Sequence, residues 1–233
     1  MNYDVKYYNY NTKHFNFEKS VTELFKVDKL SNVHKLVSDI SDELFSNSND
    51  DSTKLHSIFY DKLNSGWPEF VEMYEEFIKT VIMDIFDVDT LVCQSKPTFR
   101  VQLPNNIAVG GNTGDSKEKY GWHKDSDEEY NHPLTEKNFI VPLTNSRDTA
   151  SVYIETYPNS DKFKPAKMNV GEVFNFCGAK CVHGNKPNIT GASRVSFDFR
   201  VILKEHYDEH LVRESKLTNK KFIVGEYYKL LNR

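Results

Sequence analysis

The sequence predicts a mostly β protein with added helices, organised as one domain over residues 1–233. From about residue 91 onward, short apolar and β-branched runs alternate with turns rich in Gly, Pro and Asn, which is typical of a sandwich or jelly-roll barrel. Before that point, apolar residues recur at the spacing of amphipathic helices. A chain of 233 residues can bury a sizeable core, and no linker is long enough to divide the β region.

The N-terminal part, residues 1–90, is expected to be helical and to pack on one face of a sheet. Amphipathic patterns cover residues 18–46 and 52–64, and the polar stretch 47–52 separates them. A further helix begins near Pro68, since proline is favoured in the first turn of a helix. Its apolar stripe, which we interpret as packing, comprises Phe70, Met73, Tyr74, Phe77, Ile78, Val81, Ile82 and Ile85.

The core, residues 91–203, is predicted to consist of successive strands separated by short turns. These strands are Leu91–Leu103, Ile107–Gly110, Asn138–Leu143, Ala150–Tyr157, Glu172–Phe176 and Arg194–Leu203. The glycine-rich stretch Gly110–Ser116 is interpreted as a plain connector, with a mobile lid as the alternative. The C-terminal extension, residues 204–233, contains the segment Lys220–Leu231, which can cover an edge strand.

The composition argues against several classes of partner. The chain has 30 basic and 34 acidic side chains and no dense Lys/Arg block, so neither nucleic acid nor an anionic membrane is expected to bind. The N-terminus lacks the order of a signal peptide, and no apolar run approaches the roughly 20 residues that span a bilayer. Three cysteines are too few for a disulfide scaffold. We therefore expect a cytoplasmic protein that acts on a small molecule.

A histidine and an aspartate lie two residues apart in the segment Gly121–Asp125. On an extended strand His123 and Asp125 point to the same face and can bind one metal ion. His183, which glycine follows, supplies a third ligand. Two imidazoles and one carboxylate on one face of an octahedron suit iron(II), whereas a closed zinc site typically adds cysteine. The sequence therefore predicts His123, Asp125 and His183 as the catalytic and metal-binding residues.

Two nearby residues compete as ligands. His132 precedes Pro133, which denies a strand its donor and favours a loop at this point. Asp127 shares the face of Asp125 only if the strand continues, but the following residues are typical of a turn. Both are therefore ranked below the predicted ligands.

The last predicted strand of the core has one polar and one apolar face. The polar face carries Arg194, Ser196, Asp198 and Arg200. If this face is buried, a guanidinium on it needs an anionic partner, which the carboxylate of an acidic co-substrate can supply. Arg194 with Ser196 is the first candidate for this anchor, and Arg200 is the second. The alternative is an exposed face on which Asp198 pairs with an arginine.

Several segments together carry a family resemblance. They are Trp122–Asp127, Asn131–Pro133, Val141–Thr144, His183–Asn185 and Thr190–Arg200. Over residues 97–203 the chain resembles the StrG-like proteins, which are named for streptomycin biosynthesis and are a branch of the iron(II)- and 2-oxoglutarate-dependent oxygenases. The resemblance implies a double-stranded β-helix, a jelly-roll or cupin-like core, with N-terminal helices packed on the sheet.

The resemblance also implies iron(II) and 2-oxoglutarate as cofactors, held by His123, Asp125 and His183 and by Arg194 with Ser196. Asn138 is a further candidate contact to 2-oxoglutarate. Such enzymes consume molecular oxygen and release succinate and CO2, and hydroxylation of the substrate is the expected outcome. Halogenases of this superfamily lack the carboxylate ligand, so Asp125 disfavours halogenation, while desaturation, epimerisation and ring formation stay open.

The expected substrate is a small polar metabolite such as a sugar or amino-acid derivative. Candidate substrate contacts near the predicted barrel mouth are Arg100, Gln102, Lys124, Glu155 and Asn185. Two other functions fit the same fold: a non-catalytic jelly-roll module that binds a sugar or carboxylate, and a cupin-like metal isomerase that needs neither oxygen nor 2-oxoglutarate.

Overall fold

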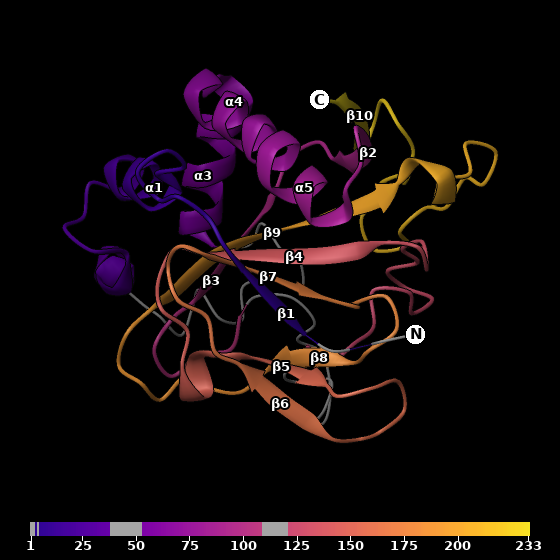
Figure 1. The fold of residues 1–233 in the computed structure, drawn as a ribbon. Coiled ribbons are helices and arrows are strands. Elements are labelled where there is room, and N and C mark those ends of the chain that lie inside the picture. Colours follow the sequence, from indigo (N-terminus) through magenta and orange to yellow (C-terminus); the bar gives the residue numbers. More distant parts are fainter. Residues whose placement is uncertain (1–2, 4, 38–52, 109–120) are drawn as a thin grey trace.

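A computed structural model describes residues 3, 5–37, 53–108 and 121–233. Two antiparallel sheets lie one above the other, and helices cover the outer face of the larger sheet (Figure 1). The seven-stranded sheet has the order β1-β7-β4-β9-β2-β10, and β3 also pairs with β9. Its strands are β1 (Lys6–Asn9), β2 (Thr90–Gln94), β3 (Thr98–Gln102), β4 (Lys137–Pro142), β7 (Glu172–Phe176), β9 (Arg194–Leu203) and β10 (Tyr228–Asn232). The three-stranded sheet contains β6 (Phe163–Ala166), β5 (Val152–Glu155) and β8 (His183–Asn185), in that order.

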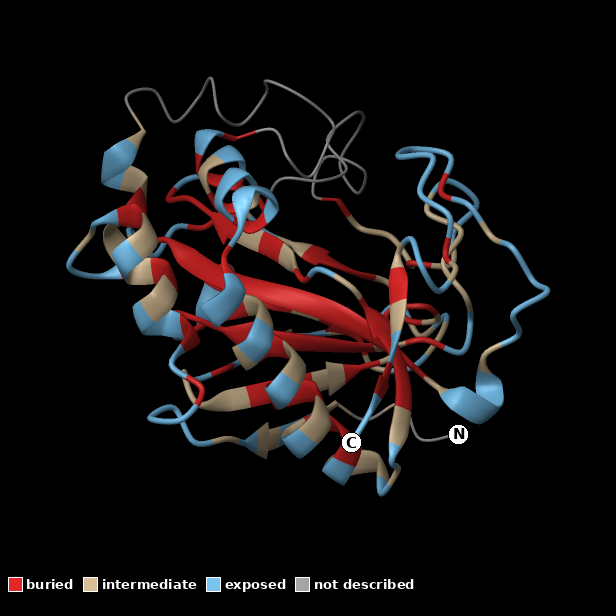
Figure 2. Cartoon of the chain, turned by 90° about the horizontal axis from the view of Figure 1, so that it is seen from above, coloured by how far each residue is buried: buried red, intermediate tan, exposed pale blue. Residues whose placement is uncertain are grey.

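The helical layer begins with α1 (Phe17–Phe25) and the 3-10 helix η1 (Leu30–Leu36) and continues with α3 (Lys54–Ser65). It then runs from α4 (Pro68–Phe77) through the π-helical turn η2 (Ile78–Ile82) into α5 (Met83–Phe86). Two short 3-10 helices, η4 (Asp148–Ala150) and η5 (Lys204–His206), lie in connections between strands. Seen from above, the helices expose their outer surfaces and bury the surfaces that meet the sheet (Figure 2). None of the helices in the described ranges is long and apolar enough to cross a membrane.

The long strand β9 is the centre of the molecule. It pairs with β4 along one edge, while β3 and β2 share its other edge. Its apolar side chains, such as Val195 and Phe197, join the core between the sheet and the helices. A separate apolar cluster, which includes Ile140, Ile154 and Phe174, fills part of the space between the two sheets. The polar side chains of β9 are also buried, so this strand has protein on both faces.

The expected elements are largely confirmed. The bounds of β7 and β9 match the predicted strands, and the proposed packing stripe of the third helix is buried or packed against the core. β10 pairs with β2 at the edge of the large sheet, which confirms that the segment Lys220–Leu231 covers an edge strand. The strands β1, β6 and β8 were not predicted, because each has only three or four residues.

Two expectations about the strands were wrong. The run Leu91–Leu103 is two strands, because the chain bends at residues 95–97 and Pro97 lacks the N–H that a continuous ladder needs. Residues 107 and 108 form no strand, and the rest of that predicted strand and the glycine-rich stretch Gly110–Ser116 lie outside the described residues. In the expected helical region 18–46, α1 ends at Phe25 and residues 38–46 are likewise not described.

Replacing Phe197 by alanine is expected to lower the free energy of unfolding by about 3–5 kcal/mol. The ring is fully buried and contacts the rings of Phe17, Phe70 and Tyr74, so its loss leaves a cavity where the helices meet the sheet. Urea unfolding followed by circular dichroism measures the change. Tyr157→Ala, at a side chain that is 53% exposed, is the control and is expected to leave stability nearly unchanged. Wild-type stability of Phe197→Ala would contradict this account of the core.

Candidate metal centre

Three side chains meet between the two sheets. One potential ligand atom from each of His123, Asp125 and His183 lies within 4.8 Å of the other two. The Nε2 atoms of His123 and His183 lie 3.4 Å and 3.5 Å from Oδ1 of Asp125. The two histidines are brought together by the backbone, because each donates its N–H to the carbonyl of the other at 3.0 Å and 2.9 Å. The predicted ligands therefore converge, and the group can hold a metal ion.

Backbone carbonyls orient both imidazoles. Nδ1 of His123 lies 2.7 Å from the carbonyl oxygen of Gly121, and Nδ1 of His183 lies 3.1 Å from that of Cys181. A carbonyl only accepts, so each Nδ1 carries the proton and each Nε2 has a free lone pair. This is the tautomer that a metal ligand requires, and Nε2 is the atom that faces Asp125 on both rings.

The carboxylate of Asp125 has its two oxygens in different surroundings. Oδ2 accepts from the side-chain amide of Asn138 and from Nε and Nη2 of Arg200, at 3.3 Å and 3.2 Å. Oδ1 faces the two imidazoles. Burial alone would raise the pKa of Asp125, but the nearby Arg200 guanidinium holds that pKa well below its usual range. The group is therefore an ionised carboxylate with one oxygen left for a metal.

The register between β4 and β9 explains why two donors reach the same oxygen. Asn138 lies directly opposite Arg200 on neighbouring strands. The amide oxygen of Asn138 accepts from the N–H of Gly178 at 3.0 Å, and the carbonyl of Gly178 accepts from the N–H of Asp125 at 2.9 Å. Nη1 of Arg200 binds Oδ2 of Asp198 at 2.8 Å. Asn138 and Arg200 thus hold Asp125 in place.

Arg194 lies on the same face of β9 as Arg200, but it has no carboxylate partner of its own in the described parts of the chain. Its Nη2 donates to Oδ1 of Asn185 at 2.9 Å, whereas Nε and the hydroxyl of neighbouring Ser196 are buried and have no hydrogen-bond partner among the described residues. Burial is the main cause that lowers the pKa of Arg194, to about 10, and the nearby Arg100 lowers it further. The expected alternative of an exposed face is wrong, although Asp198 does pair with arginines.

The sequence comparisons agree with this geometry. The streptomycin biosynthesis protein StrG of Streptomyces griseus is 34% identical to the chain over 188 residues, which is 81% of each protein. The chain belongs to the StrG family. The search against protein-family models found no model that matches this StrG-family chain.

Solved structures that this StrG-family chain resembles share little sequence with it. The non-heme, alpha-ketoglutarate-dependent carbocyclase SnoK from nogalamycin biosynthesis is 11% identical, with a TM-score of 0.47, and the match covers 72% of this chain and 73% of SnoK. CytC3 with Fe(II) and alpha-ketoglutarate is 12% identical, with a TM-score of 0.44, over 91% of this chain and 84% of CytC3. At this level of similarity the solved structures do not define the chemistry of the StrG-family site.

The expected substrate contacts do not form one group. Arg100 is partly buried and pairs with Asp198 through Nε at 2.8 Å. Gln102 is fully buried, donates to the carbonyl of Lys186 at 2.7 Å and leaves its own amide oxygen without a hydrogen-bond partner among the described residues. The side-chain oxygen of Asn185 accepts a hydrogen bond from Arg194. These three residues surround the polar face of β9.

Lys124 and Glu155 lie elsewhere in this StrG-family chain. Lys124 reaches Asn159 at 3.4 Å in an exposed contact. Glu155 is buried and accepts from the backbone N–H groups of Asp161 and Val182 at 3.0 Å and 3.1 Å. The structure therefore shows that Glu155 holds the backbone at Asp161 and Val182.

The competing ligands have other partners. Nδ1 of His132 binds the buried carboxylate of Glu136 at 2.9 Å, and Asp127 accepts from the N–H of Lys124 at 2.8 Å. Sequence reasoning missed Tyr130, whose ring stacks on His123 at 4.3 Å between centroids. No sequence signal marks this residue, because its contact depends on how the turn after Asp125 folds back.

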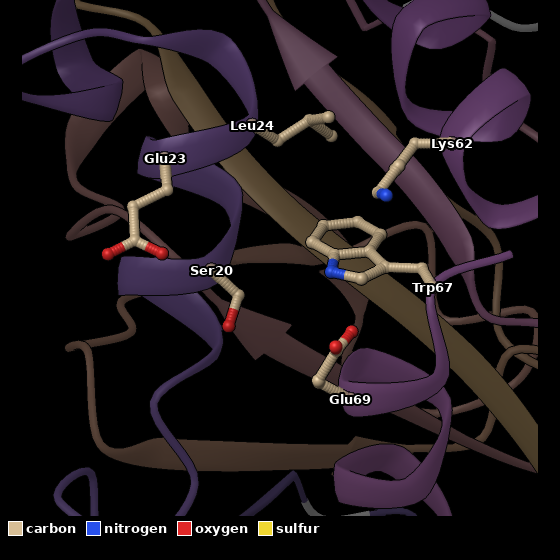
Figure 3. A pocket seen from close by; sticks show the side chains of 6 residues that line it. All are labelled: Ser20, Glu23, Leu24, Lys62, Trp67 and Glu69. Atoms are coloured by element: carbon tan, nitrogen blue, oxygen red, sulfur yellow. The ribbon is translucent and has the colours of Figure 1, made fainter.

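A cavity of about 300 Å³ lies in the helical layer, away from this centre (Figure 3). It is lined by Ser20, Glu23, Leu24, Lys62, Trp67 and Glu69, which come from α1, α3 and the start of α4. None of these residues belongs to the metal-binding group or to the polar face of β9, so this cavity is separate from the candidate metal centre.

Replacing Gly178 by alanine is expected to weaken metal binding about tenfold. The new methyl carbon would lie 2.7 Å from the side-chain amide of Asn138 and would push it away from Asp125. Titration with Mn(II), a redox-stable substitute for iron(II), measures the affinity. The double variant Gly178→Ala/Asn138→Ala is expected to bind no more weakly than Asn138→Ala alone, because both changes act through the same amide. Unchanged affinity of Gly178→Ala would contradict the role given to Asn138.

Proposed function

We propose that the chain is a non-haem iron(II)- and 2-oxoglutarate-dependent dioxygenase. The observation that carries the proposal is Arg194, a fully buried guanidinium whose Nε finds no partner among the described residues. The unpaired hydroxyl of Ser196 lies two residues along the same strand face. A buried cation with an unsatisfied donor calls for an anion, and a carboxylate can accept two parallel hydrogen bonds from a guanidinium.

The donor set fits iron(II). Two neutral imidazoles and one hard carboxylate leave open coordination positions, and cysteine is absent from the group. Because Asn138 and Arg200 occupy Oδ2 of Asp125, only Oδ1 is available to the metal. Bound iron(II) with 2-oxoglutarate and oxygen would supply an oxidant able to attack an unactivated C–H bond, with succinate and CO2 as co-products.

The residues of the chain would position the co-substrate and keep water out. 2-Oxoglutarate has a carboxylate at each end, so its keto-acid end would face the metal group while Arg194 and Ser196 bind its other carboxylate. Arg194 and Ser196 lie on the buried inner face of β9 in the large sheet, whereas His183 belongs to β8 of the small sheet and His123 bridges to it. In this proposal the two sheets correspond to a double-stranded β-helix within a single domain of residues 1–233.

The substrate is proposed to be a small polar metabolite such as a sugar or amino-acid derivative, and hydroxylation its most direct outcome. The membership in the StrG family supports a role in biosynthesis. Of the expected substrate contacts, Arg100 and Gln102 are the ones we propose to face the substrate. Both lie on β3, where Gln102 pairs with Arg194 and Arg100 pairs with Ser196 of β9. Presence of the Asp125 carboxylate argues against halogenation.

A binding module and a metal isomerase are the competing functions. A carboxylate-binding module would use the buried cation of Arg194 but would not need the metal-binding group, and an isomerase would use the metal-binding group but would not need the cation. Anaerobic addition of iron(II) and 2-oxoglutarate should give a weak visible charge-transfer band, and oxygen should then release succinate. A binding module would give neither signal, and an isomerase would turn over without oxygen or 2-oxoglutarate.

Arg194→Gln is expected to abolish 2-oxoglutarate binding and to leave Mn(II) affinity largely unchanged, because the side chain has no contact with the metal-binding group. Loss of the guanidinium removes the paired donors for the far carboxylate. Calorimetric titration with 2-oxoglutarate in the presence of Mn(II) measures the loss. Arg147→Gln, which removes an exposed hydrogen bond to Asn169, is the matched control. Wild-type 2-oxoglutarate binding by Arg194→Gln would refute the assigned anchor.

A further inference from the structure

The three residues of the metal-binding group are not equally fixed. The side chain of Asp125 is 2% exposed and that of His183 is 11% exposed, whereas that of His123 is 23% exposed. His183 also packs against the buried ring of Phe176. The χ2 torsion of histidine is broad, so the direction of Nε2 on His123 depends on what the ring contacts. Those contacts include the carbonyl of Gly121, the ring of His183 and, on one face, Tyr130.

The turn that follows Asp125 places Tyr130 on that face. We call residues 125–132 the ligand turn. The N–H groups of Tyr130 and Asn131 bind the carbonyl of Asp127 at 3.0 Å and 2.7 Å, and that of His132 returns to the carbonyl of Asp125 at 2.9 Å. Asn131 adopts a left-handed conformation with φ of 55°. The ring of Tyr130 then lies nearly parallel to that of His123, at 28°.

A loop of the C-terminal extension is hydrogen-bonded to this turn. We call residues 213–222 the clasp, since hydrogen bonds between Arg213 and Phe222 and between Ser215 and Lys220 close it on itself. Asn131 donates to the carbonyl of Glu214 at 3.0 Å and accepts from Arg213 at 3.2 Å. The carbonyl of Glu129 accepts from the N–H of Lys216 at 2.9 Å and from the hydroxyl of Ser215 at 3.4 Å. The Lys216 side chain also pairs with Glu128.

A second set of contacts links His132, at the end of the ligand turn, to the C-terminal extension. The buried carboxylate of Glu136 joins Nδ1 of His132 to the hydroxyl of Tyr228, which lies in β10. The ring of His132 also packs on Phe222, at 4.0 Å between centroids. Contacts from the C-terminal extension thus reach both the outer and the inner side of the ligand turn.

We propose that the clasp and Tyr130 position His123 for metal binding. The clasp holds the ligand turn through Asn131, and the turn holds the ring of Tyr130 against the one imidazole that the core leaves partly exposed. Tyr130 and Asn131 are therefore positioning residues, and the C-terminal extension is part of the site. This inference rests on the metal centre of the proposed function.

Two substitutions test the proposal at different points. Tyr130→Leu removes the aromatic stack, and Tyr130→Phe keeps it. Asn131→Gly removes both side-chain contacts to the clasp but tolerates the left-handed backbone. The control, Arg233→Ala, breaks an ion pair of the same C-terminal extension with Asp84, which lies in α5. Mn(II) affinity is measured by titration, and the melting temperature of each metal-free protein is measured in parallel.

Tyr130→Leu and Asn131→Gly are expected to bind Mn(II) about tenfold more weakly than the wild-type protein. Their metal-free melting temperatures should match that of Arg233→Ala, and Tyr130→Phe should bind Mn(II) as the wild-type protein does. If only Tyr130→Leu binds Mn(II) more weakly, the proposed role of the clasp in metal binding is wrong. Wild-type affinity in both variants, or a loss explained by the unfolded fraction at the assay temperature, would overturn the whole inference. Failure of the wild-type protein itself to bind Mn(II) would instead refute the proposed metal centre.

Discussion

The candidate site depends on how the buried carboxylate of Asp125 is compensated. A carboxylate inside a protein is costly unless it is paired and hydrogen-bonded, and here Arg200 and Asn138 provide both forms of support. Arg200 is balanced in turn by Asp198, which also pairs with Arg100 near the surface. Opposite charges thus alternate from the metal-binding group outward. Loss of one member would leave its neighbour buried and uncompensated, so the chain of charges acts as a unit.

The strand β9 can bury these charged side chains on one face because its other, apolar face is fully packed against the helices. Val195, Phe197, Phe199 and Val201 are fully buried against the helical layer, and β9 has neighbouring strands along both edges. Burial of that apolar face offsets part of the cost of burying arginines and an aspartate on the opposite one. The helices therefore support the metal-binding group without contributing a residue to it.

Much of the site could be predicted from short-range sequence patterns. The two-residue spacing marked His123 and Asp125, although His123 forms only an isolated bridge and Asp125 lies in a turn; strand alternation does hold for Arg194 and Ser196 on the inner face of β9. The partners of Asn138 and Arg200 could not be predicted, because they follow from the register between β4 and β9, which no local pattern specifies. The strands β1, β6 and β8 were missed because each is too short to show a period, whereas the bend at residues 95–97 carries a local signal, Pro97, that the prediction did not use.

The unsatisfied donor on Arg194 also has a thermodynamic meaning for the folded chain. An isolated cation in the interior disfavours the native state, and a diacid that neutralises it would bind only that state. Mass action then couples folding to metabolite supply, by about 2.7 kcal/mol when the free diacid is at about 100 times its dissociation constant. Under the proposed function, the lifetime of the polypeptide in a cell would rise and fall with the pool of that diacid.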